Sequence, residues 1–230
     1  MSFERARLHE YERLLSRPGL AATGLRWALG SQGAFVMNGP LLRLPDELNM
    51  EPSLRVLDIG CGRASVLRFM DGRVRFDRRP VGLDFSRAIL RHAQRDGAAT
   101  SHPPALVQGS ATSLPIAPGA FDFVLCGYLV KHLDDDGLRD LLDEVWRVLA
   151  PGGLALIWEF APTGRRFLDA WNRRWLGRHV RSPQLRSGRT LLRFAQEAGF
   201  PFAIEAGLRP FLFPPVPRAS ILFGRPPEEA

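Results

Sequence analysis

The chain of 230 residues has almost no lysine, because Lys131 is the only one among 31 basic residues and the others are arginines. It has two cysteines, Cys61 and Cys126, so a disulfide framework does not stabilise the fold. No apolar run approaches the roughly 20 residues needed to span a bilayer. The first twenty residues lack the apolar segment of a secretory signal, so we expect a cytoplasmic protein.

The composition is that of an ordinary globular protein, with 45% hydrophobic and 24% charged residues. It excludes a disordered chain, a coiled coil and a collagen-like repeat. The net charge of +7 is spread unevenly along the chain. From Thr163 to Arg193 there are nine arginines and one acid, Asp169, which gives a local charge of +8. The rest of the chain is therefore close to neutral.

Short apolar runs alternate with helical patterns through the middle of the chain. The pattern predicts an α/β fold: a Rossmann-like, seven-stranded, mostly parallel sheet with helices on both faces. The predicted strands are 55–60, 80–85, 105–110, 121–127, 154–160, 202–209 and 219–223. The predicted helices begin at 64, 86, 135 and 190, and Pro151-Gly152-Gly153 is expected to stop the third near residue 149. Ser86 is expected to cap the second.

The two ends of this pattern define the expected domain organisation. Residues 1–50 form an N-terminal helical extension or lid, in which 3–17 read as an amphipathic helix. Residues 51–230 form the main domain. Within it, an arginine-rich lid segment is expected at about 163–187.

The turn after the first predicted strand carries the strongest chemical signal. Gly60 and Gly62 allow tight backbone geometry and close approach of a ligand. A dinucleotide site is the first interpretation, but Ser65 stands where its third glycine would be. Asp58 also precedes the turn, and a carboxylate there would repel a pyrophosphate. A cationic ligand without phosphate, such as S-adenosylmethionine (SAM), fits that charge better.

Asp84 closes the second predicted strand, 24 residues after Gly60. A carboxylate at this place can accept hydrogen bonds from both hydroxyls of a ribose. NAD-binding and SAM-binding proteins share this feature, so Asp84 does not separate them. A charge at a helix N-terminus is the structural alternative.

Four motifs in order resemble the class I SAM-dependent methyltransferases, in particular the branch that includes the ubiquinone and menaquinone C-methyltransferases. VLDIGCG at 56–62 and VGLDFS at 81–86 resemble the first two motifs of that family. GSATSLPIAPGAFDFVLCGYLVKHL at 109–133 resembles its third block, and RVLAPGGLALI at 147–157 its motif after the next helix. The resemblance covers residues 55–158 and implies a methyltransferase with SAM as its cofactor.

The resemblance also implies roles for individual residues. The implied cofactor-binding residues are Asp58, Gly60 and Gly62 at the methionine end, Asp84 at the ribose, Phe85, Ser110 and Ala111 at the adenine, and Cys126, with Gly127, near the transferred methyl. Two positions depart from the family pattern. Ser110 stands where the family often has an aspartate, which removes a charge-assisted hydrogen bond to the adenine. Lys131 replaces the first histidine of a usual pair, and we expect it to be a surface lysine.

Methyl transfer from a sulfonium needs a base only if the acceptor must lose a proton. The candidate catalytic residues are His132, Tyr128 and Glu159, each near a predicted strand end. Packing is the alternative for His132, and a pocket wall is the alternative for Tyr128. Asp134-Asp135-Asp136 are interpreted as helix caps, and we expect no metal site.

The arginine-rich segment contains a predicted helix with Phe167, Trp171 and Trp175 four residues apart. Four interpretations remain open. It could be a lid over the substrate, a contact of residues 165–178 with an anionic membrane surface, a solvated structural helix, or a nucleic acid contact. Nucleic acid is the least favoured, because the chain lacks the Pro-Pro-aromatic motif typical of base methylation.

These observations together predict a SAM-dependent methyltransferase acting on a small, apolar or aromatic molecule. The alternatives are an RNA methyltransferase and a SAM-binding protein without turnover. We expect the protein in the cytoplasm, with peripheral contact to a membrane if residues 165–178 bind one. The sequence gives no indication of the oligomeric state.

Overall fold

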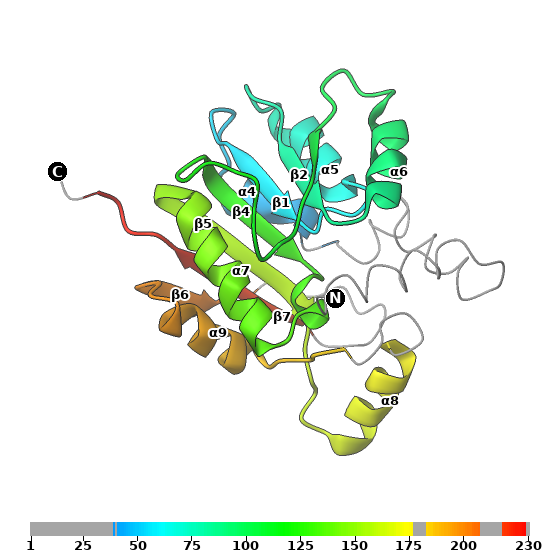
Figure 1. Ribbon diagram of the computed structural model, residues 1–230, viewed down its shortest axis with the longest axis vertical. Helices are drawn as coiled ribbons and strands as arrows, with labels where there is room; N and C mark the ends of the chain where they lie inside the picture. Colours follow the sequence, from blue (N-terminus) through cyan, green and yellow to red (C-terminus); the bar gives the residue numbers. More distant parts are fainter. Residues whose placement is uncertain (1–38, 40, 177–182, 208–217, 229–230) are drawn as a thin grey trace.

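A computed structural model describes residues 39, 41–176, 183–207 and 218–228 (Figure 1). The helix predicted over 3–17 lies outside these ranges. Residues 41–50 contain a 3-10 helix, Leu41–Arg43, and the short helix α4, Leu44–Glu47. Leu41 and Leu44 are buried together with side chains of the main domain. This last part of the predicted extension therefore packs onto the sheet.

The sheet has seven strands in the order β3-β2-β1-β4-β5-β7-β6. The first five strands are parallel, β7 is antiparallel to β5, and β6 is antiparallel to β7. The predicted Rossmann-like, mostly parallel sheet is therefore confirmed. The strands are β1 (Val56–Ile59), β2 (Val81–Asp84), β3 (Ala105–Gln108), β4 (Phe121–Gly127), β5 (Leu149–Phe160), β6 (Phe202–Glu205) and β7 (Arg218–Gly224).

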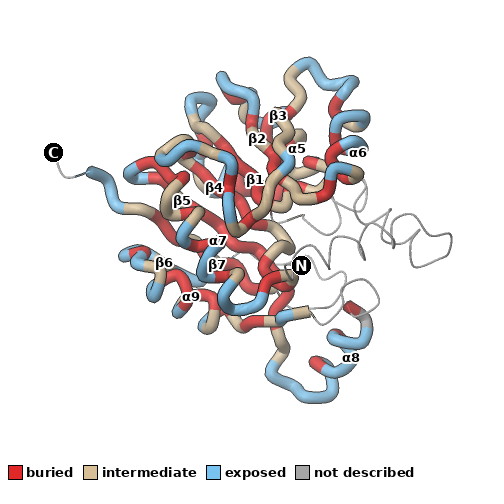
Figure 2. Tube along the Cα trace, in the orientation of Figure 1, coloured by how far each residue is buried: buried red, intermediate tan, exposed pale blue. Residues whose placement is uncertain are grey.

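Helices cover both faces of this sheet. Side chains of α5 (Ser65–Val74) and α6 (Arg87–Gly97) pack in one buried cluster, and those of α7 (Asp135–Val148) and α9 (Gly188–Glu197) pack in the other. Figure 2 shows the central strands buried and much of helix α8 (Arg166–Leu176) exposed. Both layers of helices are needed because a parallel sheet is apolar on both faces.

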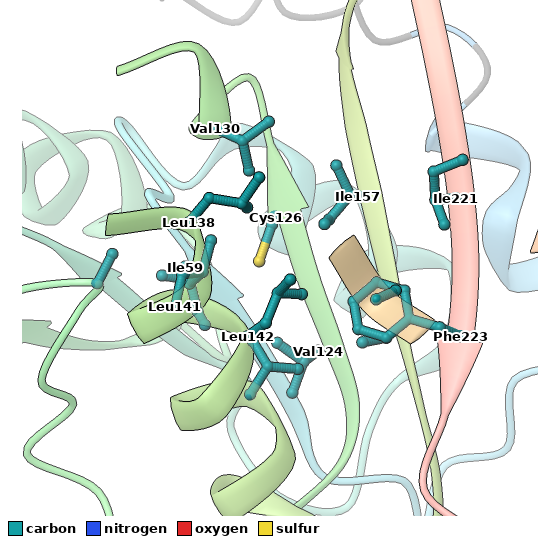
Figure 3. Packing of buried hydrophobic residues seen from close by; sticks show 14 of the residues in the cluster. Ile59, Val124, Cys126, Val130, Leu138, Leu141, Leu142, Ile157, Ile221 and Phe223 are labelled. Carbon is teal, nitrogen blue, oxygen red and sulfur yellow. The ribbon is translucent and has the colours of Figure 1, made fainter. Parts of the chain in front are cut away.

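Strand β4 shows how the sequence supplies both clusters. Val124 and Cys126 join the cluster of α7 and α9, while Phe123 and Leu125 join the cluster of α5 and α6. Successive side chains of a strand point to opposite faces, so a continuous apolar run fills two cores. Figure 3 shows Cys126 among Leu138 and other side chains of the cluster of α7 and α9.

The predicted helix signals are mostly confirmed. The Ser86 hydroxyl accepts a hydrogen bond from the Ile89 amide at 3.3 Å, which caps α6. The Asp134 carboxylate caps α7 by accepting from the Gly137 amide at 2.9 Å. Gly199 has φ +87° just beyond α9, where a left-handed residue ends the helix.

The sequence prediction differs from the structure around Pro151-Gly152-Gly153. The helix ends at Val148, close to the predicted residue 149, but the strand predicted to begin at 154 begins at Leu149, so the segment lies inside β5. The pairing of β4 with β5 shifts between Phe121 and Phe123, and Gly152 has φ +76°. A bulge of this kind inserts extra residues without ending the strand.

Candidate functional site

The turn after β1 is built by two glycines with positive φ, Gly60 at +77° and Gly62 at +54°. The amides of Gly60 and Cys61 both donate to the Leu83 carbonyl of β2, at 2.8 and 2.9 Å. A Cβ on Gly60 would lie 3.2 Å from the Leu129 side chain, while one on Gly62 would meet nothing within 4 Å. The turn is therefore fixed to β2 and leaves open space beside Gly62.

Asp84 ties this turn to the end of β2. Its carboxylate accepts from the Gly62 amide at 3.0 Å and from the Ser86 amide at 2.8 Å. Burial raises the pKa of Asp84, and these two hydrogen bonds oppose that rise. Each carboxylate oxygen has a second lone pair. Asp84 can therefore hold the turn and still accept hydrogen bonds from a ligand, a positioning role that the sequence did not show.

Asp58 is the least compensated charge of the site. It is 4% exposed at the end of β1, and its carboxylate has no ion pair with any residue that the structure describes. Burial and the negative charge of Asp84 raise the pKa of Asp58 to about 7. The same two carboxylates help to raise the pKa of the buried Cys61 thiol. An uncompensated negative charge in such a place favours a cationic ligand.

The predicted adenine contacts lie around the ends of β2 and β3. Phe85 is half-buried and belongs to neither core cluster, so its ring is free of core packing. Its carbonyl accepts from the Gln108 side chain at 3.3 Å. The Ser110 hydroxyl accepts from the Thr112 amide at 3.1 Å, within its own turn. Ala111 is buried in the core, so only its backbone can contact a ligand.

Cys126 differs from the other predicted cofactor residues. Its side chain is 1% exposed and packs in the cluster of α7 and α9 (Figure 3). Burial raises the pKa of its thiol, so the thiol remains neutral. Its position near the transferred methyl stays a prediction, and the buried side chain leaves its backbone as the part that could face a cofactor. Because side chains alternate along β4, the side chain of residue 126 points to the face of the sheet that α7 and α9 cover, where the core is apolar.

The ends of β4 and β5 bring together a second cluster of residues. Tyr128 has φ +55°, an uncommon conformation for a residue with a side chain, and its amide donates to the Trp158 carbonyl at 2.7 Å. Its hydroxyl accepts from the Trp158 indole at 2.9 Å and from the Arg218 guanidinium at 3.3 Å. Its ring lies 4.7 Å from that of Phe160. Burial raises the pKa of Tyr128, and Arg218 opposes the rise.

Lys131 is the main surprise of this second cluster. It is 5% exposed, so the predicted surface position is wrong. Its ammonium group donates to the Tyr128 carbonyl, lies 3.6 Å from the Glu159 carboxylate, and is 5.4 Å from the centre of the Tyr128 ring. Burial lowers the pKa of Lys131, and Glu159 opposes that change. A buried ammonium needs such partners because desolvation penalises the charge.

Glu159 is fully engaged inside the protein. Its carboxylate accepts from the amides of Lys131 at 3.0 Å and Phe160 at 2.8 Å, in addition to the contact with the Lys131 ammonium. These bonds favour a structural role for Glu159 over the predicted proton transfer. His132 is half-buried at the end of the 3-10 helix Val130–His132. Tyr128 and His132 thus remain the predicted catalytic residues of this region.

Arg186 holds the same loop from the arginine-rich segment, a role that the sequence did not reveal. Its guanidinium donates to the carbonyls of Val130 and Leu133, both at 3.0 Å, and to the Asp135 carboxylate at 2.7 Å. Arg186 and Arg218 come from distant parts of the chain, so no motif connects them with the loop. For Lys131, its being the only lysine was the available signal.

Comparisons with known proteins agree with this geometry. Residues 56–153 match the family model described as "Methyltransferase domain". The chain is 31% identical over 137 residues to the 2-phytyl-1,4-naphtoquinone methyltransferase of Thermosynechococcus vestitus, covering 59% of each protein. It is 31% identical over 117 residues to the demethylmenaquinone methyltransferase of Staphylococcus saprophyticus, covering 51% of this chain and 49% of that one. It thus spans about half to three fifths of the length of these relatives.

Solved structures show the same fold at low sequence identity. The apo S-adenosylmethionine-dependent methyltransferase SibL superposes with a TM-score of 0.73 and 20% identity, over 94% of this chain and 62% of that one. Human N-acetylserotonin methyltransferase in complex with SAM superposes with a TM-score of 0.67 and 14% identity, over 97% and 56%.

Proposed function

Because the chain carries a class I SAM-dependent methyltransferase domain, we propose that it transfers a methyl group from SAM to a small, apolar or aromatic molecule. SAM is the cofactor of this class of domain, and when bound it supplies an activated methyl group on a positively charged sulfur. Two relatives at 31% identity are named for 2-phytyl-1,4-naphtoquinone and for demethylmenaquinone. A quinone-type ring is therefore the acceptor class that we propose first.

The residues at the end of β1 fit this cofactor. The observation that carries the proposal is the buried Asp58 carboxylate, beside Gly60, with a pKa of about 7 and no cationic partner among the described residues. A positive ligand at this turn relieves an unfavourable charge, whereas a pyrophosphate would add to it. We propose that Asp84 accepts hydrogen bonds from the ribose hydroxyls and that the half-buried Phe85 lies against the adenine ring.

The second cluster supports the acceptor end of the proposal. Tyr128 and Phe160 form a tilted aromatic pair at the carboxyl ends of β4 and β5. Lys131, Glu159 and Arg218 fix the backbone and the rings around that pair. A rigid wall of this kind can align an acceptor with a methyl donor, an effect worth about 7–11 kcal/mol of the barrier in well-oriented reactions. His132 would take a proton if the acceptor must lose one, while Tyr128, whose hydroxyl stays protonated because burial raises its pKa, would form a wall of the acceptor pocket.

Titration calorimetry tests the cofactor assignment directly. We expect heat of binding for SAM and for its demethylated product, and none for NAD. Heat for NAD alone would reject the proposal. Turnover is then tested with quinols, phenols and lipids, using transfer of a labelled methyl group as the readout. Binding without transfer to any of them would favour the alternative of a SAM-binding protein without turnover.

The place of action in the cell is proposed separately from the reaction. None of the helices in the described ranges combines the length and the apolar character required to cross a bilayer. We propose a cytoplasmic protein, in which contact of residues 165–178 with an anionic membrane would give access to a lipophilic acceptor. Residues 177 and 178 lie outside the described ranges.

A further inference from the structure

Helix α8 carries its large apolar side chains on the side that faces away from the protein. Phe167 is 80% exposed and Trp171 is 62% exposed, with the exposed Leu168 next to Phe167. Asp169 and Asn172 are buried instead. An ordinary surface helix has the reverse arrangement, with apolar residues inside and polar residues outside. In this structure the described aromatic face of α8 is exposed, and the lid interpretation stays a prediction.

Specific contacts fix this orientation at both ends of the helix. Near its start, the Asp169 carboxylate accepts from the amide and the hydroxyl of Thr163, both at 2.6 Å. Near its end, Leu176 is buried against Phe160, with Tyr128 and Leu185 packed beside them. Rotating α8 to bury Trp171 would break both sets of contacts. The exposure of the aromatic face therefore follows from how the helix is anchored.

The charges around the apolar face are all positive. Arg165, Arg166, Arg173 and Arg174 are exposed, and none forms an ion pair with a described residue. The only acid between residues 163 and 193 is Asp169, whose carboxylate accepts hydrogen bonds from the amide and the hydroxyl of Thr163. Aromatic and aliphatic side chains beside arginines are the composition of helices that lie in the interface of an anionic bilayer.

The position of α8 connects this face with the candidate site. The helix follows β5, which is parallel to β4 and β1, so it lies at the edge where these strands end (Figure 1). Leu176 also touches the aromatic cluster of Tyr128 and Phe160 directly. A surface bound by α8 would therefore lie near the site that we propose for the acceptor.

We propose that α8 is a membrane-docking helix, in which Phe167, Leu168 and Trp171 enter the lipid interface and the flanking arginines bind anionic head groups. The contact deepens the proposed function by giving a lipophilic acceptor a route to the site, but it depends only on the exposed face of α8. It can be measured without cofactor or turnover. Failure of docking and failure of methyl transfer are therefore separate results.

Flotation with lipid vesicles is the experiment. Wild-type protein floats with vesicles that contain phosphatidylglycerol and not with phosphatidylcholine alone, and added salt weakens the binding. The Phe167→Ser/Trp171→Ser variant loses at least about tenfold in affinity, because two aromatic side chains no longer leave water. Replacing Arg173 and Arg174 by glutamine weakens binding about fivefold for each arginine.

Matched variants elsewhere on the surface provide the controls. Phe202→Ser removes an exposed aromatic residue from β6, and Arg91→Gln removes an exposed arginine from α6. Both bind vesicles like the wild type. Trp171→Phe keeps an apolar side chain, so it floats but loses part of the fluorescence blue shift that accompanies docking. Calorimetry with SAM shows that every variant is folded, since α8 contributes none of the residues placed at the cofactor.

Four results would overturn the proposal. These are unchanged flotation of Phe167→Ser/Trp171→Ser, an equal loss for Phe202→Ser, a dimer that buries Trp171 without lipid, and salt-sensitive binding of single-stranded RNA in place of vesicles. The last would assign the same face to a nucleic acid.

Discussion

Two clusters of buried charge lie at the carboxyl ends of the strands, and the protein treats them in opposite ways. Asp58 lies near the end of β1 and Asp84 is the last residue of β2, and no described cation forms an ion pair with either. Glu159 is the next-to-last residue of β5 and has Lys131 and two backbone amides as partners. The first cluster leaves a charge for a ligand to neutralise, while the second uses its charges to hold the fold. The comparison predicts that substitutions in the first cluster mainly change the affinity for the ligand, and that substitutions in the second mainly change the free energy of unfolding.

The largest effect on stability is expected from Lys131→Met. It leaves the buried Glu159 carboxylate without its ammonium partner, which should lower the free energy of unfolding by about 3–5 kcal/mol. Chemical denaturation measures the change. The double variant Lys131→Met/Glu159→Gln should recover part of the loss, because the unpaired charge is gone.

The control for this variant is Arg139→Met, which breaks the exposed pair with Asp136. Exposed pairs contribute little, so its stability should stay near that of the wild type. Equal losses for Lys131→Met and Arg139→Met would contradict the role that we give to the second cluster.

Asp58→Asn should act in opposite directions on binding and on stability. Loss of the carboxylate weakens SAM binding by about 1.5–3 kcal/mol, the usual contribution of a hydrogen bond to a charged group. The ligand-free protein becomes more stable at pH 8, because a buried and uncompensated charge is removed. Calorimetry and thermal unfolding measure the two effects. A variant that loses stability and keeps its affinity would place Asp58 with the structural cluster instead.

Asp84→Ala should weaken SAM binding by about 1–3 kcal/mol through the loss of a charged acceptor. It also frees the Gly62 amide, so the turn loses one of its anchors. Asp122→Ala is the matched control, because Asp122 also accepts from a backbone amide, that of Arg55, but lies at the other end of the sheet. The control should lose stability and keep its affinity for SAM.

The pH dependence sharpens the comparison further. The folded-state pKa of Asp58 is raised to about 7, so the ionised form that attracts a cation predominates only above that pH. Affinity for SAM should fall as the pH drops below 7 and level off near the affinity of Asp58→Asn, in which the charge is absent at every pH. The stability of the ligand-free protein should change in the opposite sense. The free energy of unfolding falls as the pH rises from the pKa of Asp58 in the unfolded chain through about 7, its pKa in the folded protein. The reason is that the folded state loses a proton that it binds more tightly than the unfolded state does. Asp58→Asn should remove the share of both dependences that comes from Asp58, and leave the share of Asp84, whose pKa burial also raises.

The smallest effect on binding is expected from Cys126→Ala. Its thiol packs in the core, so the substitution should leave affinity for SAM unchanged and lower stability by about 1 kcal/mol. Weakened binding with unchanged stability would show that the side chain reaches the cofactor after all.

The residues that could be predicted are those whose role depends on local sequence. Gly60, Gly62 and Asp58 lie within five consecutive positions, and Asp84 ends the next strand, so spacing alone placed them at one edge of a parallel sheet. Lys131 and Arg218 could not be placed in this way. Arg218 meets Tyr128 only because β5 pairs with both β4 and β7, and Lys131 meets Glu159 only because β4 and β5 are neighbours in the sheet.

In the arginine-rich segment, too, the sequence did not show which charged side chains are buried and which are exposed. Its composition predicted a cationic helix, but it did not distinguish Arg186, which is buried and binds the loop after β4, from Arg173 and Arg174, which are exposed. It also did not show which face of α8 turns outward. The Thr163–Asp169 contact and the packing of Leu176 set that orientation.

The sequence by itself determined the alternation of strands and helices, the glycine turn and the negative charge beside it, because each depends on neighbouring residues and on strand and helix periodicity. Only the tertiary structure decided that Asp58 has no described cationic partner, that Glu159 pairs with Lys131, and that the side chain of Cys126 lies in the core. Burial and charge pairing depend on which distant elements pack together, and that is a property of the assembled sheet.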